Sequence, residues 1–446
     1  MSIIIPANSA VAGGFDVPNG VRFNTQSSTE YLQRTMSSVG NMQAWTVSVW
    51  VKRAVISDGQ HMLFAAYNNS SNSTECFFEG NDTLNFRDNE SGSFQFQKKT
   101  SMKFRDPSAW YHLVMSSSAG TQRIYVNGVE VTAWDTNTNG SGTSTWNNDK
   151  SHSIGANVNG GSDKAGLYMA EFTSIDGQTL TPTSFGEFDE DSGIWVPKDV
   201  TELTFGTNGF YLPFSNSGAL GEDFSGNNLD FAVNNMNATN QTTDTCTNNF
   251  ATLNSIDKGY GTTVHTEGNL KATSSSGWNP ARGTIGVTKG KWYWEIMSGN
   301  SFQVGVSNDT IDFANDANSQ DLAGVTVYYN GSGGYIRTDG SQVGSNNGTF
   351  SASDTAGFAL DMDNKKLSVY KNGSIIVTNT SLSTSITNVA MIYGTTNGGG
   401  DFEINFGSPF YAISSGNADG NGYGNFEYSV PSGYFSLNTK NLAEYG

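Results

Sequence analysis

Three carboxylates alternate along a short acidic segment of the chain, at Glu187, Asp189 and Asp191. A retaining glycosidase needs two carboxyl groups about 5–5.5 Å apart, and residues i and i+2 on one strand approach that separation. However, the segment follows Thr-Pro-Thr-Ser-Phe-Gly and precedes Ser-Gly-Ile-Trp-Val-Pro, a turn-rich context without aromatic alternation. We therefore predict a solvated acidic loop here rather than a catalytic pair.

Other catalytic patterns are missing from the sequence. The histidines show no metal-ligand spacing such as His-Glu-X-X-His, no serine stands in a Gly-X-Ser-X-Gly motif, and Gly398–Gly400 lacks the Lys-Ser/Thr that a phosphate-binding loop requires. His112 alternates with Trp110 and Val114, which is the pattern of a strand residue rather than a general base. The sequence predicts that the protein is not an enzyme, with no catalytic residues and no cofactor.

Glycan binding is the sharper hypothesis, and it rests on Trp134, Asp135 and Trp146. Sugar sites combine a stacking aromatic ring with Asn, Asp or backbone groups that bind hydroxyls, sometimes around Ca²⁺. Both tryptophans lie in polar surroundings, and either could instead cover a core or contact another subunit. The candidate Ca²⁺ ligands are Asp135, Asp149 and Asp163, although no EF-hand loop is present.

Two Asn-Gly pairs indicate the elements that must carry these residues. Asn127-Gly128 and Asn372-Gly373 each lie between alternating apolar runs, and a type I′ hairpin turn needs the positive φ that Asn and Gly adopt easily. Upstream, Trp45, Val47, Val49 and Val51 fall on one face of a strand. No helical periodicity extends beyond about three turns. The pattern predicts an all-β protein.

The amino-acid composition limits which binding partners and which cell compartment we expect for the protein. The 446 residues carry a net charge of −18, and 14% of them are charged. An acidic surface repels phosphate backbones and anionic membranes, so we expect no nucleic-acid binding, and no apolar run is long enough for membrane insertion. Because the chain opens without a signal-peptide core and holds only Cys76 and Cys246, we expect synthesis in a reducing cytoplasm and no bond between these cysteines.

The order of strand-rich and turn-rich stretches predicts two domains in series. The expected parts are an N-terminal arm (1–20), a first sandwich (21–178), a connecting segment partly packed on the first domain (179–255), a second sandwich (256–410) and a C-terminal tail (411–446).

Several motifs resemble known domain families. The first domain resembles a laminin-G-like, concanavalin-type jelly roll in Trp45–Lys52, Trp110–Val114 and Ile124–Gly128. The second is similar to a SPRY domain in Gly290–Glu295 and Gly357–Asp363. These resemblances imply two antiparallel jelly-roll β-sandwich domains, one concanavalin A-like and one SPRY-like.

The whole chain is also similar to large, tail-fibre-like or lectin-like virion proteins of marine tailed phages, for example in Asp176–Pro182 and Thr247–Asn254. The resemblance implies synthesis in the cytoplasm of a host bacterium and a place on the virion surface, in an oligomer with other virion proteins. Its expected ligand is a host cell-surface glycan or protein. A purely structural decoration or bridging role is the main alternative, and a polysaccharide depolymerase is the weaker one.

Overall fold

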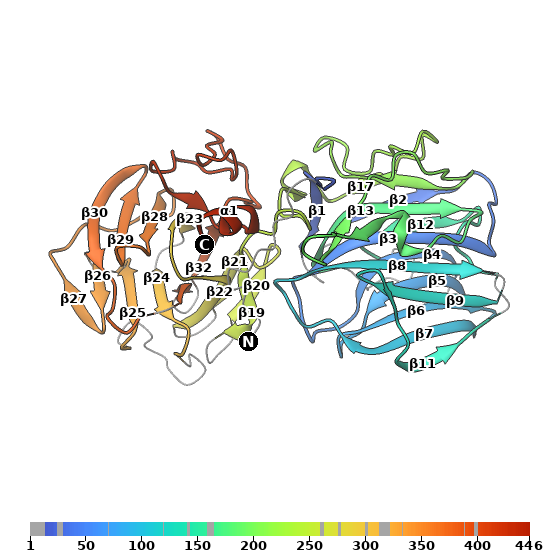
Figure 1. Cartoon of the computed structure of the whole chain (residues 1–446), viewed down its shortest axis with the longest axis horizontal. Coiled ribbons are helices and arrows are strands. Elements are labelled where there is room, and N and C mark those ends of the chain that lie inside the picture. The colour runs from blue at the N-terminus through green and yellow to red at the C-terminus, as the bar shows by residue number, and fades with distance from the viewer. Residues whose placement is uncertain are drawn as a thin grey trace. The chain divides into compact units, whose positions relative to one another are not determined.

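The computed structural model describes residues 14–24, 30–69, 71–118, 120–140, 143–157, 165–258, 263–274, 278–298, 302–311, 322–331, 333–387, 389–396 and 400–446. Strands make up 49% and helices 3% of the structure, which confirms the all-β prediction. Apart from one short parallel pair, the described strands pair antiparallel. The described residues form two compact units, 14–247 and 248–446 (Figure 1).

Two eight-stranded sheets face each other in the first unit. One sheet contains β1 (Gly20–Phe23), β3 (Ala44–Arg53), β8 (Trp110–Ser118), β9 (Thr121–Val126), β10 (Val129–Glu130), β13 (Leu167–Asp176), β16 (Phe210–Leu212) and β18 (Gln241–Thr242). The other contains β2 (Tyr31–Thr35), β4 (His61–Asn69), β5 (Asn72–Phe78), β6 (Thr83–Glu90), β7 (Ser93–Lys103), β11 (Trp134–Thr138), β12 (Ser151–Ile154) and β17 (Ala232–Asn234).

Alternation along these strands builds the first core. Trp45, Val47, Val49 and Val51 of β3 are fully buried between the sheets, as their spacing predicts. Trp50 points to the opposite face, where it packs in a separate cluster. Both faces of β3 are buried, so its polar residues Thr46, Ser48, Lys52 and Arg53 are buried as well.

The segment after β13 covers the outer face of the β3 sheet. A 3₁₀ turn (Pro182–Ser184) leads to a hairpin of β14 (Gly186–Phe188) and β15 (Trp195–Pro197), and a second 3₁₀ turn (Ala238–Asn240) precedes β18. Phe185, Val200 and Phe205 pack against Val114 and Ile175 of the sheet. Residues 179–247 therefore belong to the structure of the first unit.

The second unit is also a sandwich of two sheets. One contains β19 (Leu253–Lys258), β22 (Asn279–Val287), β24 (Phe302–Asn308), β25 (Val325–Tyr329), β26 (Tyr335–Thr338), β27 (Ser341–Val343) and β31 (Ala390–Thr396). The other contains β20 (Thr263–Thr266), β21 (Lys271–Ser274), β23 (Lys291–Ser298), β28 (Thr355–Asp361), β29 (Lys366–Lys371), β30 (Ser374–Ser381), β32 (Asp401–Asn405) and β33 (Phe435–Ser436). Helix α1 (Thr439–Tyr445) ends the chain.

Both Asn-Gly hairpins form as predicted. Asn127 and Gly128 join β9 to β10 with φ values of 47° and 81°. Asn372 and Gly373 join β29 to β30 with φ values of 48° and 76°.

The C-terminal segment, 411–446, is packed on the second sandwich. Glu295 of β23 accepts hydrogen bonds from the backbone N–H groups of Glu427 and Tyr428, at 2.8 and 2.9 Å. Leu437 and Leu442 complete the core of this unit. The last 36 residues thus contribute to the core rather than extending as a free tail.

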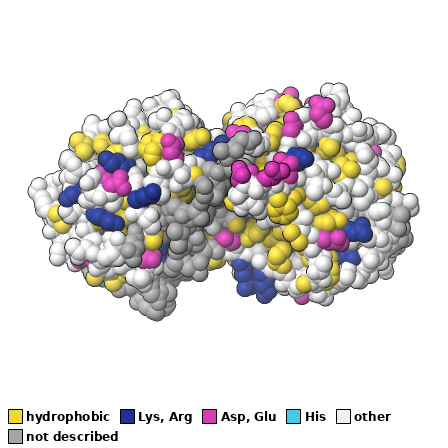
Figure 2. All heavy atoms as spheres, viewed as in Figure 1, with side chains coloured by type: hydrophobic (Ala, Val, Ile, Leu, Met, Phe, Trp, Pro, Cys, Tyr) yellow, Lys and Arg dark blue, Asp and Glu magenta, His cyan; other side chains and the backbone are white. Residues whose placement is uncertain are grey.

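Surface composition follows the low charge of the sequence. Figure 2 shows a visible surface formed mostly by uncharged side chains and backbone, with Asp, Glu, Lys and Arg in small groups. Cys76 is buried in the first core and Cys246 is half-buried, and both are free thiols. In the described part of the chain, no helix has the length and apolar character to cross a bilayer.

Candidate functional site

A pocket of about 640 Å³ lies at one end of the first sandwich. It is formed by the loop between β2 and β3, the end of β13 and the loop before β16, and its lining consists of Val39, Gly40, Asn41, Met42, Gln43, Asp176, Gly177, Gly206 and Thr207. Its volume falls within the usual range for small-ligand sites, about 300–1,000 Å³. We call it the loop-end pocket.

Asp176 holds these loops together. Its carboxylate accepts hydrogen bonds from the Asn41 N–H at 2.7 Å, the Asn208 N–H at 2.9 Å and the Asn147 side-chain amide at 3.0 Å. A Cβ at Gly40 would lie 2.5 Å from this carboxylate, so glycine permits the close approach. Because backbone and amide donors occupy the carboxylate, Asp176 positions the pocket rather than acting as an acid or base.

The groups left to meet a ligand are amides, a hydroxyl and two apolar side chains. Asn41, Gln43 and Thr207 are exposed, Val39 is 55% exposed, and Met42 is half-buried. Asp176 is the one carboxylate in the lining. Amide and hydroxyl groups can bind sugar hydroxyls or peptide groups, but a glycosidase would need a second carboxylate at the site.

The structure corrects the interpretation of Trp146 as an exposed stacking residue. Trp146 is fully buried, its ring centroid lies 4.7 Å from that of Phe64, and its indole N–H donates to the Ser174 hydroxyl at 3.2 Å. Its backbone N–H donates to Thr74, which ties the loop to the sandwich. The loop turns inward because its polar backbone groups find partners on β5 and β6.

Sequence reasoning missed the next residue, Asn147. It has a φ of 66°, a conformation that Asn tolerates better than most residues, and its side chain reaches Asp176 behind the pocket. The available signal was the polar loop around Trp146, because Asn tolerates a positive φ and its side-chain amide can donate hydrogen bonds.

Trp134 and Asp135 lie on the edge strand β11 and do not line the pocket. Trp134 is half-buried against the first core, with the Lys98 ammonium 5.4 Å from its ring centroid, while Asp135 is exposed. Asp149 pairs with Lys150 at 2.7 Å, and Asp163 lies outside the described residues. Within the described ranges, no group of three His, Cys, Asp or Glu side chains is arranged to hold a metal, so Ca²⁺ binding stays a prediction.

The acidic segment begins on β14, and Asp189 and Asp191 lie in the loop that joins β14 to β15, as the sequence predicts. Glu187 on β14 is exposed and pairs with Lys198 at 3.4 Å. Asp189 accepts hydrogen bonds from the Ser192 hydroxyl and N–H, at 2.6 and 2.8 Å, and these bonds lower the pKa of Asp189. These contacts stabilise the turn, and no acid–base pairing of the carboxylates is evident.

His112 contacts Ser48 in a way that superficially resembles a nucleophile–base pair. The Trp195 indole N–H donates to His112 Nδ1 at 2.9 Å, so the proton lies on Nε2 and is donated to the Ser48 hydroxyl at 2.8 Å. Burial lowers the pKa of His112 to about 3. A neutral imidazole whose free nitrogen is occupied cannot take the serine proton, so this contact is structural.

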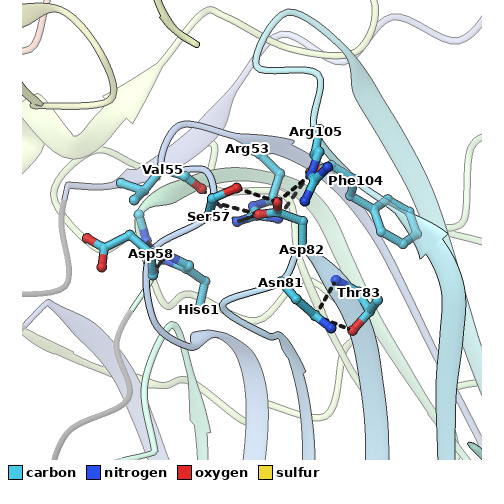
Figure 3. A network of polar contacts seen from close by, with 11 residues as sticks. Arg53, Val55, Ser57, Asp58, His61, Asn81, Asp82, Thr83, Phe104 and Arg105 are labelled. Carbon is cyan, nitrogen blue, oxygen red and sulfur yellow. Dashed lines mark hydrogen bonds and ion pairs between the residues drawn. The ribbon is translucent and has the colours of Figure 1, made fainter. Parts of the chain in front are cut away.

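A buried ion-pair network closes the opposite end of the same sandwich (Figure 3). Arg53 ends β3 and donates to the Phe104 and Val55 carbonyls at 3.1 and 2.7 Å, and it lies 3.4 Å from the Asp82 carboxylate. Asp82 also accepts from Ser57 and Arg105. The register pairs Arg53 with the first residue of β13 and Trp45 with Asp176, so the network and the pocket lie at different ends of the strands.

Comparisons with known proteins agree with the fold of the first unit. Residues 26–182 match the family model described as the Concanavalin A-like lectin/glucanases superfamily, which confirms the concanavalin-like part of the resemblance. No curated protein matches the chain.

The solved structures that are similar to parts of the chain include SPRY domains and a pentraxin. The SPRY domain of human HERC1 is 19% identical with a TM-score of 0.29, covering 34% of this chain and 96% of its own. The TRIM65 PSpry domain is 11% identical with a TM-score of 0.30, covering 34% and 89%. A heptameric SAP-like pentraxin from Limulus polyphemus is 15% identical with a TM-score of 0.27, covering 38% and 80%.

Proposed function

We propose that this chain is a binding protein of a tailed-phage virion surface, which recognises a host-surface glycan non-covalently through the loop-end pocket. The observation that carries the proposal is a pocket of amide, hydroxyl and apolar groups, held open by Asp176 at the loop end of a concanavalin A-like sandwich. Loops on a rigid sandwich commonly carry binding function.

Binding without covalent chemistry follows from the groups in the pocket. Its carboxylate is occupied by three donors, and the acidic hairpin uses Asp189 to stabilise a turn. The virion part of the proposal is supported by the resemblance of the sequence to phage appendage proteins. The acidic net charge favours a neutral ligand over an anionic one.

The pocket is tested with the purified full chain and polysaccharide extracted from a host cell envelope. Gln43→Ala combined with Thr207→Ala removes two exposed polar groups without touching the Asp176 network. We expect a loss of affinity of about thirtyfold, since two hydrogen bonds to neutral groups together contribute on the order of 2 kcal/mol. Thr138→Ala on the exposed edge of β11 is the matched control and should leave affinity unchanged.

The structural alternative is tested on the virion. Phage particles that lack this protein should adsorb poorly to host cells if it is an adhesin. Equal adsorption by fragile or misassembled particles would instead support a decoration or bridging role. Release of reducing sugar, abolished by Glu187→Gln, would support the depolymerase alternative.

A further inference from the structure

Three aromatic side chains form a partly exposed strip on the outer face of one sheet of the second unit. Trp278 immediately precedes β22, Tyr329 ends β25, and Tyr335 begins β26. The ring centroids lie 5.8 Å apart for Trp278 and Tyr329, and 5.2 Å apart for Tyr329 and Tyr335. We call this set the aromatic strip.

Strand register explains why the strip is continuous. Tyr329 pairs with Tyr335 on one side and with Gln303 on the other, and Gln303 pairs with Thr395. The neighbouring residues Tyr328 and Ile336 point into the core, so Tyr329 and Tyr335 point outward.

Apolar side chains cover part of this outer face, whereas the strip is partly exposed. Val325 and Val327, on the same side of β25 as Tyr329, are fully buried beneath Ile311 and Leu322. Trp278, Tyr329 and Tyr335 are each only half-buried. Apolar covering therefore ends before the strip, which leaves aromatic surface open to a partner.

Local backbone fixes the orientation of the central ring. A Cβ on Gly331 would lie 1.9 Å from the nearest ring carbon of Tyr329, so a larger residue would displace the ring. The same cross-strand row also contains a polar group, the Thr395 hydroxyl. This hydroxyl is buried and has no hydrogen-bond partner among the described residues. The strip is thus pre-organised.

We propose that the aromatic strip is a second binding site, a stacking platform for a neutral saccharide chain. Saccharide rings present C–H groups that pack on aromatic faces, while their hydroxyl groups can bond to the phenol edges of Tyr329 and Tyr335. Arg337, the one cation on β26, donates to the Gly340 carbonyl, so its guanidinium is engaged within the chain rather than left for an anionic ligand. The site extends the proposed function to a second sandwich but does not depend on the loop-end pocket.

The test uses the full chain titrated with maltohexaose, cellohexaose and mannohexaose, with binding followed by calorimetry and by tryptophan fluorescence. At least one of these probes should bind. Trp278→Ala and Tyr335→Ala should each weaken that binding about fivefold, while Tyr335→Phe retains most of it. Tyr423→Ala replaces a half-buried aromatic of the C-terminal segment and should have no effect.

The outcomes separate this site from the loop-end pocket. If wild-type protein binds none of the three probes, or if the folded Trp278→Ala/Tyr335→Ala double variant binds as tightly as wild type, the strip is not a saccharide platform. Loss of binding only in Gln43→Ala/Thr207→Ala would overturn the strip and leave the proposed function intact. Loss only in the strip variants would support the strip, and the loop-end pocket would then be judged by its own test with host polysaccharide.

Discussion

Glu171 interrupts strand β13 with a backbone conformation that few non-glycine residues adopt. Its φ is 53°, and the register between β13 and β3 shifts at this point, as in a β-bulge. The side chain is buried and accepts a hydrogen bond from the Tyr211 hydroxyl at 2.5 Å. Burial raises the pKa of Glu171 to about 7.

The raised pKa of Glu171 predicts that the stability of the protein depends on pH. Because its pKa is higher in the folded than in the unfolded chain, its stabilising effect is complete below about pH 4.5 and is lost as the pH rises through about 7. Between pH 4.5 and 8, the free energy of unfolding of wild type should therefore fall relative to Glu171→Gln by up to about 3 kcal/mol. Urea unfolding across this range measures the difference. The exposed Glu190→Gln should follow wild type, and parallel profiles for Glu171→Gln would contradict the prediction.

Asp82 predicts a second effect at the residue scale. Its side chain is fully buried and compensates Arg53, whose side chain is also fully buried. Asp82→Ala leaves that guanidinium without a carboxylate, which should lower the free energy of unfolding by about 3–5 kcal/mol. Glu130→Ala breaks an exposed ion pair with Arg123 and should cost less than about 1 kcal/mol. The free energies of unfolding are measured with guanidinium chloride as denaturant. Similar losses of this free energy in the two variants would argue against a structural role for the network.

At the scale of elements, the hairpin between β9 and β10 is constrained twice. Gly128 has a φ of 81°, and a Cβ there would lie 2.4 Å from the ring of Trp195 on β15. The short turn therefore also provides the surface on which the β14–β15 hairpin packs. Gly193 has a similar φ of 68° but no heavy atom within 4 Å of an added Cβ.

Comparing these two glycines separates backbone strain from steric contact. Gly193→Ala should cost about 1 kcal/mol, because only the left-handed backbone is disfavoured. Gly128→Ala should cost at least about 1 kcal/mol more, since the Trp195 ring must also move. The midpoints of urea unfolding give both values. An equal loss of unfolding free energy in the two variants would mean that the β9–β10 hairpin does not pack against the β14–β15 hairpin as described.

For the whole molecule, each sandwich has its own core, and the division falls near residue 247. We expect fragments 14–247 and 248–446 to fold separately, each with a cooperative transition. Fragment 248–410 should not fold stably, because it lacks Leu437 and Leu442 and leaves the Glu295 carboxyl without its backbone donors. Circular dichroism melts of the three fragments test this, and a stable fragment 248–410 would show that the C-terminal segment is dispensable.

The sequence by itself determined the features that depend on near neighbours. The Asn127-Gly128 and Asn372-Gly373 turns could be predicted because their conformation follows from two adjacent residues. The buried face of β3 could be predicted because side chains alternate along any strand. The all-β fold class follows from the repetition of such local signals, whereas the concanavalin-like character of the first sandwich was implied by the resemblance of its motifs to that family.

Only the tertiary structure decided which side chains meet at a site. Asn41 and Asp176 are 135 residues apart in sequence, yet their hydrogen bond shapes the loop-end pocket. Trp146 lies in a polar loop that left both a sugar-stacking and a core-covering role open, and backbone hydrogen bonds to β5 and β6 turn its ring into the core. Strand register aligns Tyr329 with Tyr335, and the ring of Trp278, from just before β22, packs beside Tyr329 to complete the strip. These meetings depend on how strands far apart in the sequence pair, whereas alternation and turn geometry fix register only between neighbouring strands.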